Sequence, residues 1–251
     1  MTDRKCPTDM SQGHLASIIA ADIRLHHLYR PHLPNMANIW ASQRLIYRPV
    51  VPTDDPFLAK VNSDPTDYTQ SSNMVPHPTG PRDGTSYREF LTGKGQLLGC
   101  IICLGPGSAE KGTGDGSGDG QDESNPSSRE REQKEPIPIG AVSLSGVVNP
   151  AVMHHRHSVL GIAIGKEHQS NGYGTDAIKW CFRWGFRFAG LHRIGVTAFE
   201  WNTGAIKLYR RMGLIEEGRQ REYFFFDGRF WDAVCFSILE HEWRDKFEKA
   251  E

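Results

Sequence analysis

The sequence predicts an α+β protein whose mixed, mostly antiparallel central sheet has about seven strands and is flanked by about four helices. Strand-like segments outnumber amphipathic helical segments, and most of the strand-like segments follow one another without a helix between them. The chain also ends in two strand-like segments joined by Asp227-Gly228, a dipeptide that favours a tight hairpin turn. A hydrophobic share of 38% over 251 residues is enough to build a sizeable core.

The predicted fold begins with a strand from Leu45 to Val50. Thr53 or Asp54 can cap a helix that continues through Val61, because short polar side chains accept hydrogen bonds from the first helical amides. A second short helix is expected from Thr85 to Leu91.

Three successive strands are predicted next, from Gln96 to Leu104, from Ile137 to Val148 and from His157 to Ile164. They are suited to an antiparallel meander. Apolar residues with a 3.6-residue spacing then predict an amphipathic helix from Thr175 to Ala189. A strand from Leu191 to Phe199 follows it.

The last part of the fold is a helix and a hairpin. Asn202 is expected to cap the helix, whose inward stripe includes Tyr209, and Gly213 stands where a left-handed residue ends a helix. Two strands, from Leu214 to Phe226 and from Arg229 to Leu239, complete the sheet.

These elements predict a single domain over residues 42–243, preceded by a partly irregular arm (1–41) and followed by a short tail (244–251). The arm contains a mildly apolar stretch, Leu15 to Leu28, that allows one short helix. Residues 105–135 are mostly Gly, Ser, Asp, Glu and Lys, so they cannot bury enough surface to offset chain entropy. We expect them to be a disordered insertion that lengthens one hairpin connection.

Charge and hydropathy narrow the class of partner. A formal net charge of -1 gives no basic field for nucleic acid or anionic lipid, which favours a small-molecule or protein partner. No apolar run approaches the roughly 18 residues that span a bilayer, and the N-terminus lacks the apolar core of a signal peptide. We therefore expect no nucleic-acid or membrane partner and a cytoplasmic location, with the nucleus as the alternative.

Five cysteines spread along the chain do not resemble a disulfide framework and fit a reducing compartment. Cys100 and Cys103 form a CxxC pair inside a predicted strand, where positions three apart point to opposite faces, so we expect two buried apolar residues. His154, His155 and His157 have no acidic or cysteine companion nearby, so we expect a solvated loop and no metal site.

The segment from Gly165 to Thr175 joins a predicted strand to an amphipathic helix. Its glycines, Gly172 and Gly174, allow a ligand to approach the backbone closely. The unpaired N–H groups of the helix's first turn, with the positive end of the helix dipole behind them, form a site for an anion. The pattern predicts a diphosphate-binding loop, although a Gly-rich turn without a ligand has the same composition.

Two ordered motifs give this loop a family resemblance. Gln169-x-x-Gly172-x-Gly174 is similar to the Gln/Arg-x-x-Gly-x-Gly/Ala motif of the GNAT superfamily of N-acetyltransferases. The following segment, Asn202-x-x-Ala205-x-x-Leu208-Tyr209-x-x-x-Gly213, resembles the next motif of that family. The stretch from Glu217 to Trp243 and the opening residues from Ser42 to Arg48 resemble the RimJ/RimL-like subgroup in particular.

The resemblance implies a sheet that is splayed in its middle and a cosubstrate, acetyl-CoA, bound there without a metal. It implies direct transfer of the acetyl group to a primary amine in a ternary complex, with a protein or peptide amine slightly favoured as acceptor. Mapped onto this sequence, the expected cofactor-binding residues are the strand residues Ile162, Ala163 and Ile164, the loop residues Gln169, Ser170, Asn171, Gly172, Tyr173, Gly174 and Thr175, and the helix cap Asn202.

Two residues are predicted to take part in the chemistry. Tyr209 is the candidate proton donor for the departing thiolate, because a phenol with a pKa of about 10 is protonated at neutral pH. It can equally be an aromatic core residue. Glu200, just after a predicted strand, is the candidate general base, or else a solvated loop carboxylate. A base is unnecessary if the acceptor is an α-amine, whose pKa is about 7.7 to 8.0.

Two other functions compete with the transferase. A non-catalytic acyl-CoA sensor or interaction module can share the same fold, since fold does not fix function. An NAD(P)-binding oxidoreductase is suggested by Gly172-x-Gly174-x-x-Ala177, but several polar residues separate Ile164 from Gly172 and the chain ends in a hairpin.

Overall fold

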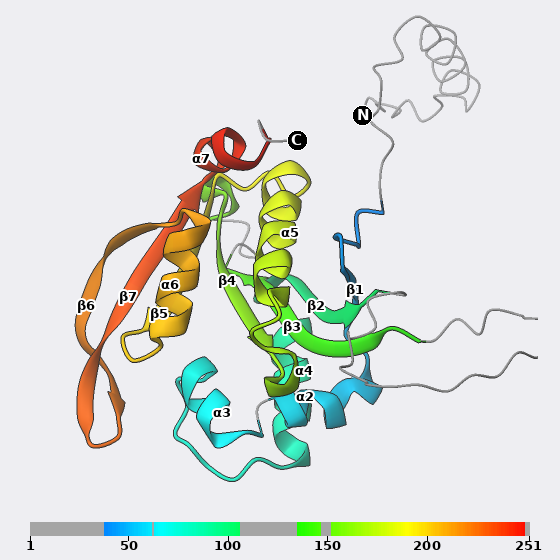
Figure 1. The fold of residues 1–251 in the computed structure, drawn as a ribbon, viewed down its shortest axis with the longest axis vertical. Coiled ribbons are helices and arrows are strands. Elements are labelled where there is room, and N and C mark those ends of the chain that lie inside the picture. The colour runs from blue at the N-terminus through cyan, green and yellow to red at the C-terminus, as the bar shows by residue number, and fades with distance from the viewer. Residues whose placement is uncertain (1–37, 62, 106–134, 147–151, 249–251) are drawn as a thin grey trace, which may run out of the picture. The chain divides into compact units, whose positions relative to one another are not determined.

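A seven-stranded sheet, in the order β1-β2-β3-β4-β5-β7-β6, organises the computed structural model (Figure 1). The structure describes residues 38–61, 63–105, 135–146 and 152–248. The strands are β1 (Leu45–Pro49), β2 (Gln96–Leu104), β3 (Ile137–Ser145), β4 (His157–Ile164), β5 (Arg193–Phe199), β6 (Ile215–Phe226) and β7 (Arg229–Leu239). The predicted helix between Leu15 and Leu28 and nearly all of the predicted insertion lie outside the described residues.

Strand pairing is antiparallel throughout the sheet except between β4 and β5, which are parallel. The β6–β7 hairpin turns at Asp227 and Gly228, whose φ angles are 50° and 76°. Positive φ at both central residues is the geometry that matches the twist of a two-residue hairpin, and Asp-Gly accepts it readily. The α+β prediction with a mixed, mostly antiparallel sheet is confirmed.

Helices cover both faces of this sheet. They are α2 (Asp55–Val61), α3 (Pro65–Ser71), α4 (Pro81–Thr92), α5 (Tyr173–Arg187), α6 (Thr203–Met212) and α7 (Glu240–Trp243). The predicted caps of α6 are confirmed, because the Asn202 side chain accepts a hydrogen bond from Ala205 N (2.9 Å) and Gly213 has a φ of 85°. Of the six helices in the described part of the chain, α3 and α7 add to the predicted set.

The apolar core has two parts, one on each face of the sheet. The larger part packs α5 and α6 against one face, with Phe182 and Phe236 among its fully buried residues. The smaller part packs Leu58 of α2 and Leu91 of α4 against the other face. Cys100 belongs to the first and Cys103 to the second, so both cysteines are buried on opposite faces as predicted.

The chain beyond Trp243 is helical as far as Glu248, where the sequence had suggested only a tail. Phe247 packs against the larger core cluster, and Glu248 accepts a hydrogen bond from Arg187 of α5 (2.7 Å). Described residues from Ile39 onward therefore continue the same folded unit past the predicted boundary.

Candidate active site

The sheet opens between β4 and β5. These strands pair only at His157–Val159 with Arg193–Gly195. Beyond that point, Leu160–Ile164 and Val196–Phe199 face each other with no described strand pairing between them. The predicted splay is therefore present, and in the middle of the domain it leaves two strand edges whose facing backbone groups have no partner strand.

The register of β3 and β4 decides which backbone groups face this gap. Gly165 N donates to Ile139 O (2.9 Å), which makes this a hydrogen-bonded pair. Because successive residues of an antiparallel strand turn their N–H and C=O groups to alternate sides, Ala163 directs its groups at β3. Ile162 and Ile164 direct theirs into the gap. Ala163 lines the cavity. The resemblance implied that it binds the cofactor, but its backbone groups face β3 and are not available to a ligand.

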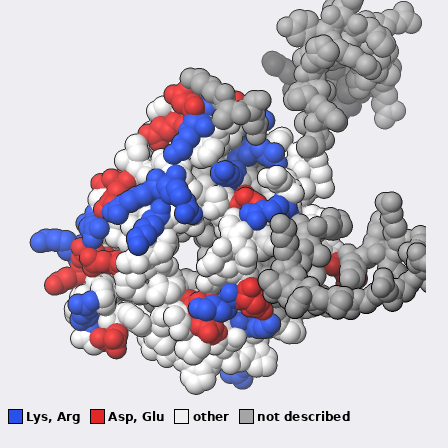
Figure 2. Space-filling view, in the orientation of Figure 1, with Lys and Arg blue, Asp and Glu red and all other residues white. Residues whose placement is uncertain are grey.

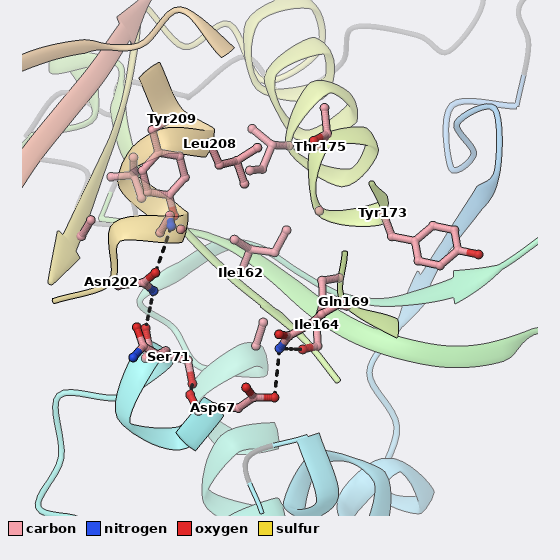
Figure 3. Close-up of a pocket in the computed structure, with 18 of the residues that line it drawn as sticks. Asp67, Ser71, Ile162, Ile164, Gln169, Tyr173, Thr175, Asn202, Leu208 and Tyr209 are labelled. Carbon is pink, nitrogen blue, oxygen red and sulfur yellow. Dashed lines mark hydrogen bonds between the residues drawn. The ribbon is translucent and has the colours of Figure 1, made fainter. Parts of the chain in front are cut away.

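The gap widens into a cavity of about 1080 Å³. Figure 3 shows residues from β4, from the start of α5, from α6 and from α3 arranged around it. The lining includes the strand edges Leu160–Ile164 and Val196–Phe199, the loop residues Gln169, Ser170 and Gly172–Thr175, the turn Trp201–Ala205 with Tyr209, and Thr66, Asp67, Gln70 and Ser71 of α3. The cavity thus brings together nearly all the residues that the sequence singled out for cofactor binding.

The first turn of α5 presents its amides to this cavity. The first bond of the helix runs from Asp176 N to Gly172 O (3.2 Å), so the N–H groups of Tyr173, Gly174 and Thr175 have no partner within the helix. A methyl group built on Gly174 would meet no protein atom within 4 Å, whereas Gly172 adopts a φ of 80°. The turn is an open cradle of donors, as a diphosphate requires.

Asn171 is the one member of the predicted loop that does not line the cavity. Its carbonyl accepts a hydrogen bond from Arg44 Nη1 (2.9 Å), and Arg44 Nε bonds Asp176 Oδ2 (2.6 Å). The Arg44 guanidinium also lies 4.9 Å from the centre of the Tyr173 ring, and the hydrogen bond to Asp176 raises the pKa of Arg44. Arg44, at the start of β1, thereby braces the loop and the first turn of α5.

Helix α3 spans the cavity between its two sides. On one side, Asp67 accepts hydrogen bonds from Lys166 Nζ (2.9 Å) and Gln169 Nε2 (3.0 Å). On the other side, the carbonyls of Thr69 and Gln70 accept bonds from Trp201 Nε1 and Asn202 Nδ2, both at 2.9 Å. Asn202 therefore caps α6 with its oxygen and holds α3 with its nitrogen.

Gln169 links the loop to the strand edge as well as to α3. Its side-chain nitrogen also donates to Ile164 O (2.9 Å), the last carbonyl of β4. The ion pair with Asp67 raises the pKa of Lys166. Asp67 was not predicted from the sequence; the sequence feature that could have indicated its helix is Asp64-Pro65, an N-cap followed by proline, and Asp64 accepts bonds from Thr66 N and Asp67 N.

Tyr209 lies on the cavity-facing side of α6 and is 7% exposed. Burial raises its pKa to about 12. Its ring packs 5.8 Å from that of Phe236, and no described residue forms a hydrogen bond with its hydroxyl. The hydroxyl is not among the described buried polar atoms that lack a partner, so it opens to the cavity and is available to a ligand.

Glu200 lies apart from this arrangement. One carboxylate oxygen pairs with Arg219 Nη1 (3.1 Å) and the other accepts a hydrogen bond from Asp232 N (3.1 Å). Glu200 does not line the cavity. The structure therefore does not bring the two predicted catalytic residues together, and it commits Glu200 to the contact between β5 and the β6–β7 hairpin.

Neither a metal-binding group nor a membrane-spanning helix is found in the described residues. The side chains of His154, His155 and His157 are exposed, and no group of three or more His, Cys, Asp or Glu in the described ranges could hold a metal ion. None of the helices described here is long and apolar enough to cross a bilayer.

A split sheet edge beside the first turn of a helix is an arrangement that suits a phosphate-bearing ligand with an extended arm. The mostly antiparallel sheet excludes the parallel, doubly wound architecture of the oxidoreductase alternative. The model of the acetyltransferase (GNAT) domain family matches residues 44–215, more than half of the chain. The chain belongs to this family.

Known proteins similar to this chain include two bacterial acetyltransferases. An uncharacterized N-acetyltransferase, YoaA, from Bacillus subtilis is 34% identical over 86 residues, which are 34% of this chain and 49% of the relative. A spermidine N(1)-acetyltransferase from Vibrio cholerae is 32% identical over 94 residues, 38% of this chain and 54% of the relative. The matched part of the chain thus spans about half the length of these relatives.

Solved structures agree on the fold. The crystal structure of a Vibrio cholerae spermidine N-acetyltransferase in complex with CoA and spermine superposes with a TM-score of 0.60 at 20% identity. The superposition covers 79% of this chain and 97% of that one. At this identity the likeness supports the fold and leaves the acceptor open.

Proposed function

We propose that the protein transfers an acetyl group from acetyl-CoA to a primary amine by direct attack in a ternary complex. One observation supports this most strongly: a single cavity joins the first-turn amides of α5, the open edge of β4 and the Tyr209 hydroxyl, which has no partner among the described residues. These are, in order, groups that suit a diphosphate, an amide-bearing arm and a departing thiolate.

Residues of this chain suit each part of the ligand. The amides of Tyr173, Gly174 and Thr175 would hold the diphosphate, and the inward-facing groups of Ile162 and Ile164 would pair with the pantetheine amides. Lys207, Arg210 and Arg211 of α6 are candidates for the outer phosphate; Arg211 lines the cavity, whereas Arg210 is paired with Glu216.

Acetyl-CoA supplies the thioester, and the residues of the chain supply polarisation and a proton. The Ile162 N–H, directed into the gap, would donate to the acetyl carbonyl as negative charge develops on its oxygen. The neutral amine forms the new C–N bond as the C–S bond breaks, and Tyr209 gives its proton to the sulfur. The acylated nitrogen then loses one proton, which returns the Tyr209 phenolate to the phenol through water in the cavity. Tyr209 is 7% exposed, so few water molecules can contact it in competition with the sulfur.

We also propose that the enzyme is RimJ/RimL-like and acts on protein or peptide amines. The sequence from Glu217 to Trp243 favours this subgroup. The domain, predicted at residues 42–243, would also include the described residues from Ile39 and through Glu248, with the insertion at 105–135 outside its catalytic part. Four described cysteines are free thiols, which supports a reducing, cytoplasmic location.

The deciding experiment mixes the purified chain with acetyl-CoA and a panel of amines and measures released thiol. We expect turnover with at least one primary amine and a raised melting temperature with acetyl-CoA or CoA but not with NADH, because a ligand that binds the native state stabilises it. Stabilisation by acetyl-CoA without turnover of any amine would favour the non-catalytic sensor. If acetyl-CoA neither stabilised the protein nor was turned over, the proposal would be contradicted.

A Glu200→Gln variant tests the predicted base. Both carboxylate oxygens of Glu200 are already engaged outside the cavity, by Arg219 and by the backbone of Asp232. The amide of the variant can still accept the hydrogen bond from Asp232 N, so the local structure should persist. We therefore expect Glu200→Gln to keep kcat within about tenfold of the wild type, which is less than the loss of a general base usually costs.

The control for this variant is its pH profile. A loss of about a hundredfold or more, recovered at high pH where the acceptor amine is already neutral, would instead identify Glu200 as the base. A lowered melting temperature with unchanged kcat would support the structural role proposed here, because the variant loses the ion pair with Arg219.

A further inference from the structure

We infer that the acceptor carries one reactive amine with uncharged flanking groups, such as the α-amine of a peptide that begins with small or apolar residues, and that it is not a polyamine. This inference rests on the proposed acetyl transfer. It concerns the end of the cavity that the cofactor leaves free, and it separates this chain from relatives named for spermidine.

The acceptor end of the cavity is set by the position of the cofactor end. The first turn of α5 and the β4 edge suit the diphosphate and its arm, so an acceptor has to approach Tyr209 from the side of α3 and β5. Apart from Asp67, the described residues that line that side are uncharged; they include Val61, Gln70, Ser71, Thr197, Phe199 and Trp201.

Asp67 is the one carboxylate among the described residues that line the cavity. Both of its oxygens are already occupied, by Lys166 Nζ (2.9 Å) and by Gln169 Nε2 (3.0 Å). Lys166 and Arg211 also line the cavity and carry positive charge. Because the Asp67–Lys166 pair is neutral as a whole, the described wall offers a polycation no free counter-charge and one unpaired like charge, that of Arg211.

The surface around the opening shows the same distribution. Figure 2 shows the hollow between α3, α6 and β4, with mainly white surface over α3 and blue side chains over α6. Positive charge thus gathers on the side of α6. It would attract the phosphates of a cofactor and repel an acceptor with several ammonium groups.

The cost of removing charged groups from water makes the lack of free carboxylates in the cavity unfavourable for a polyamine acceptor. A polyamine keeps the ammonium groups that do not react, and each one loses hydration in the cavity without a carboxylate to replace it. A single α-amine is neutral when it attacks, so it leaves no buried charge behind. Phe199 and Trp201, whose rings are stacked 4.6 Å apart, offer apolar area to a small uncharged flank.

The first test compares kcat/KM for spermidine with that for a short peptide that has an N-terminal alanine and no ionised side chains. We expect the peptide to be favoured by about a hundredfold, because a buried ammonium group without a counter-charge is strongly unfavourable. Equal or better turnover of spermidine would overturn the inference and leave the proposed acetyl transfer standing. Turnover of no amine would contradict the transfer itself.

A second test adds the missing counter-charge. Gln70→Glu places a carboxylate on the acceptor wall with almost no change in size, whereas Gln220→Glu adds the same charge to an exposed position of β6. We expect Gln70→Glu to raise the spermidine-to-peptide ratio of kcat/KM about tenfold and Gln220→Glu to leave it unchanged. An unchanged ratio in Gln70→Glu, or an equal rise in both variants, would overturn the placement of the acceptor.

Discussion

Replacing Tyr209 by phenylalanine should lower kcat about a hundredfold or more, because general acid catalysis typically contributes a factor of about 10² to 10⁴. The affinity for acetyl-CoA should change little, since the groups assigned to the diphosphate and the pantetheine belong to α5 and β4. The measurement is kcat from released thiol together with a Kd from calorimetry.

In this structure, Tyr209→Phe should remove the hydroxyl without disturbing the packing around the ring. The Tyr209 ring keeps its contact with Phe236 in the variant, and the hydroxyl that is lost has no described protein partner. No buried donor or acceptor among the described residues is left unpaired by the change, so the melting temperature should stay close to that of the wild type. Tyr223→Phe, at a tyrosine that is 61% exposed, is the matched control and should keep full activity.

The pKa of Tyr209 sets the expected pH dependence. Burial raises it to about 12, so the phenol stays protonated at every pH used in an assay and remains a proton donor. The rate should therefore rise from pH 6 to about 8 as the acceptor α-amine loses its proton, and Tyr209 should add no alkaline decline in that range. Tyr209→Phe should lower the whole profile without shifting it. A variant with wild-type kcat would remove Tyr209 from the mechanism.

Features of the site that depend on short stretches of sequence could be predicted. The glycines at the start of α5 (Gly172 and Gly174), the cap at Asn202 and the left-handed Gly213 each follow from a local pattern of residue types, and the structure has each in place. The hairpin at Asp227-Gly228 is of the same kind, since the turn conformation is decided by the two residues that adopt it.

Features that depend on contacts between distant segments could not be predicted. Arg44 braces Asp176 across a separation of 132 residues, and Asp67 reaches Gln169 across 102. Glu200 was placed correctly at the end of its strand, but its direction depends on Arg219, which a later strand supplies. The orientation of the Ala163 backbone could not be predicted either, because it depends on the register between β3 and β4.

Gly174→Leu should reduce acetyl-CoA affinity by about a hundredfold or more without lowering the melting temperature. A Cβ atom built on Gly174 meets no atom within 4 Å outside its own helical turn, so there is open space into which a leucine side chain can extend. Leucine is also favoured over glycine in a helix by roughly 1 kcal/mol. The added atoms would instead occupy the space above the first-turn amides of α5, which is where the diphosphate is proposed to lie.

Two further variants separate blocked binding from damaged structure. Gly174→Ala adds one carbon and should bind acetyl-CoA nearly as well as the wild type, whereas Gly172→Ala forces a side chain onto a φ of 80° and brings it within 3.1 Å of Arg44 Nη2. Gly172→Ala should therefore lower the stability of the fold by about 1 to 2 kcal/mol as well as weaken binding. If Gly174→Leu bound acetyl-CoA as tightly as the wild type, the diphosphate would have to lie elsewhere, and the proposed transferase would lose the observation on which it chiefly depends.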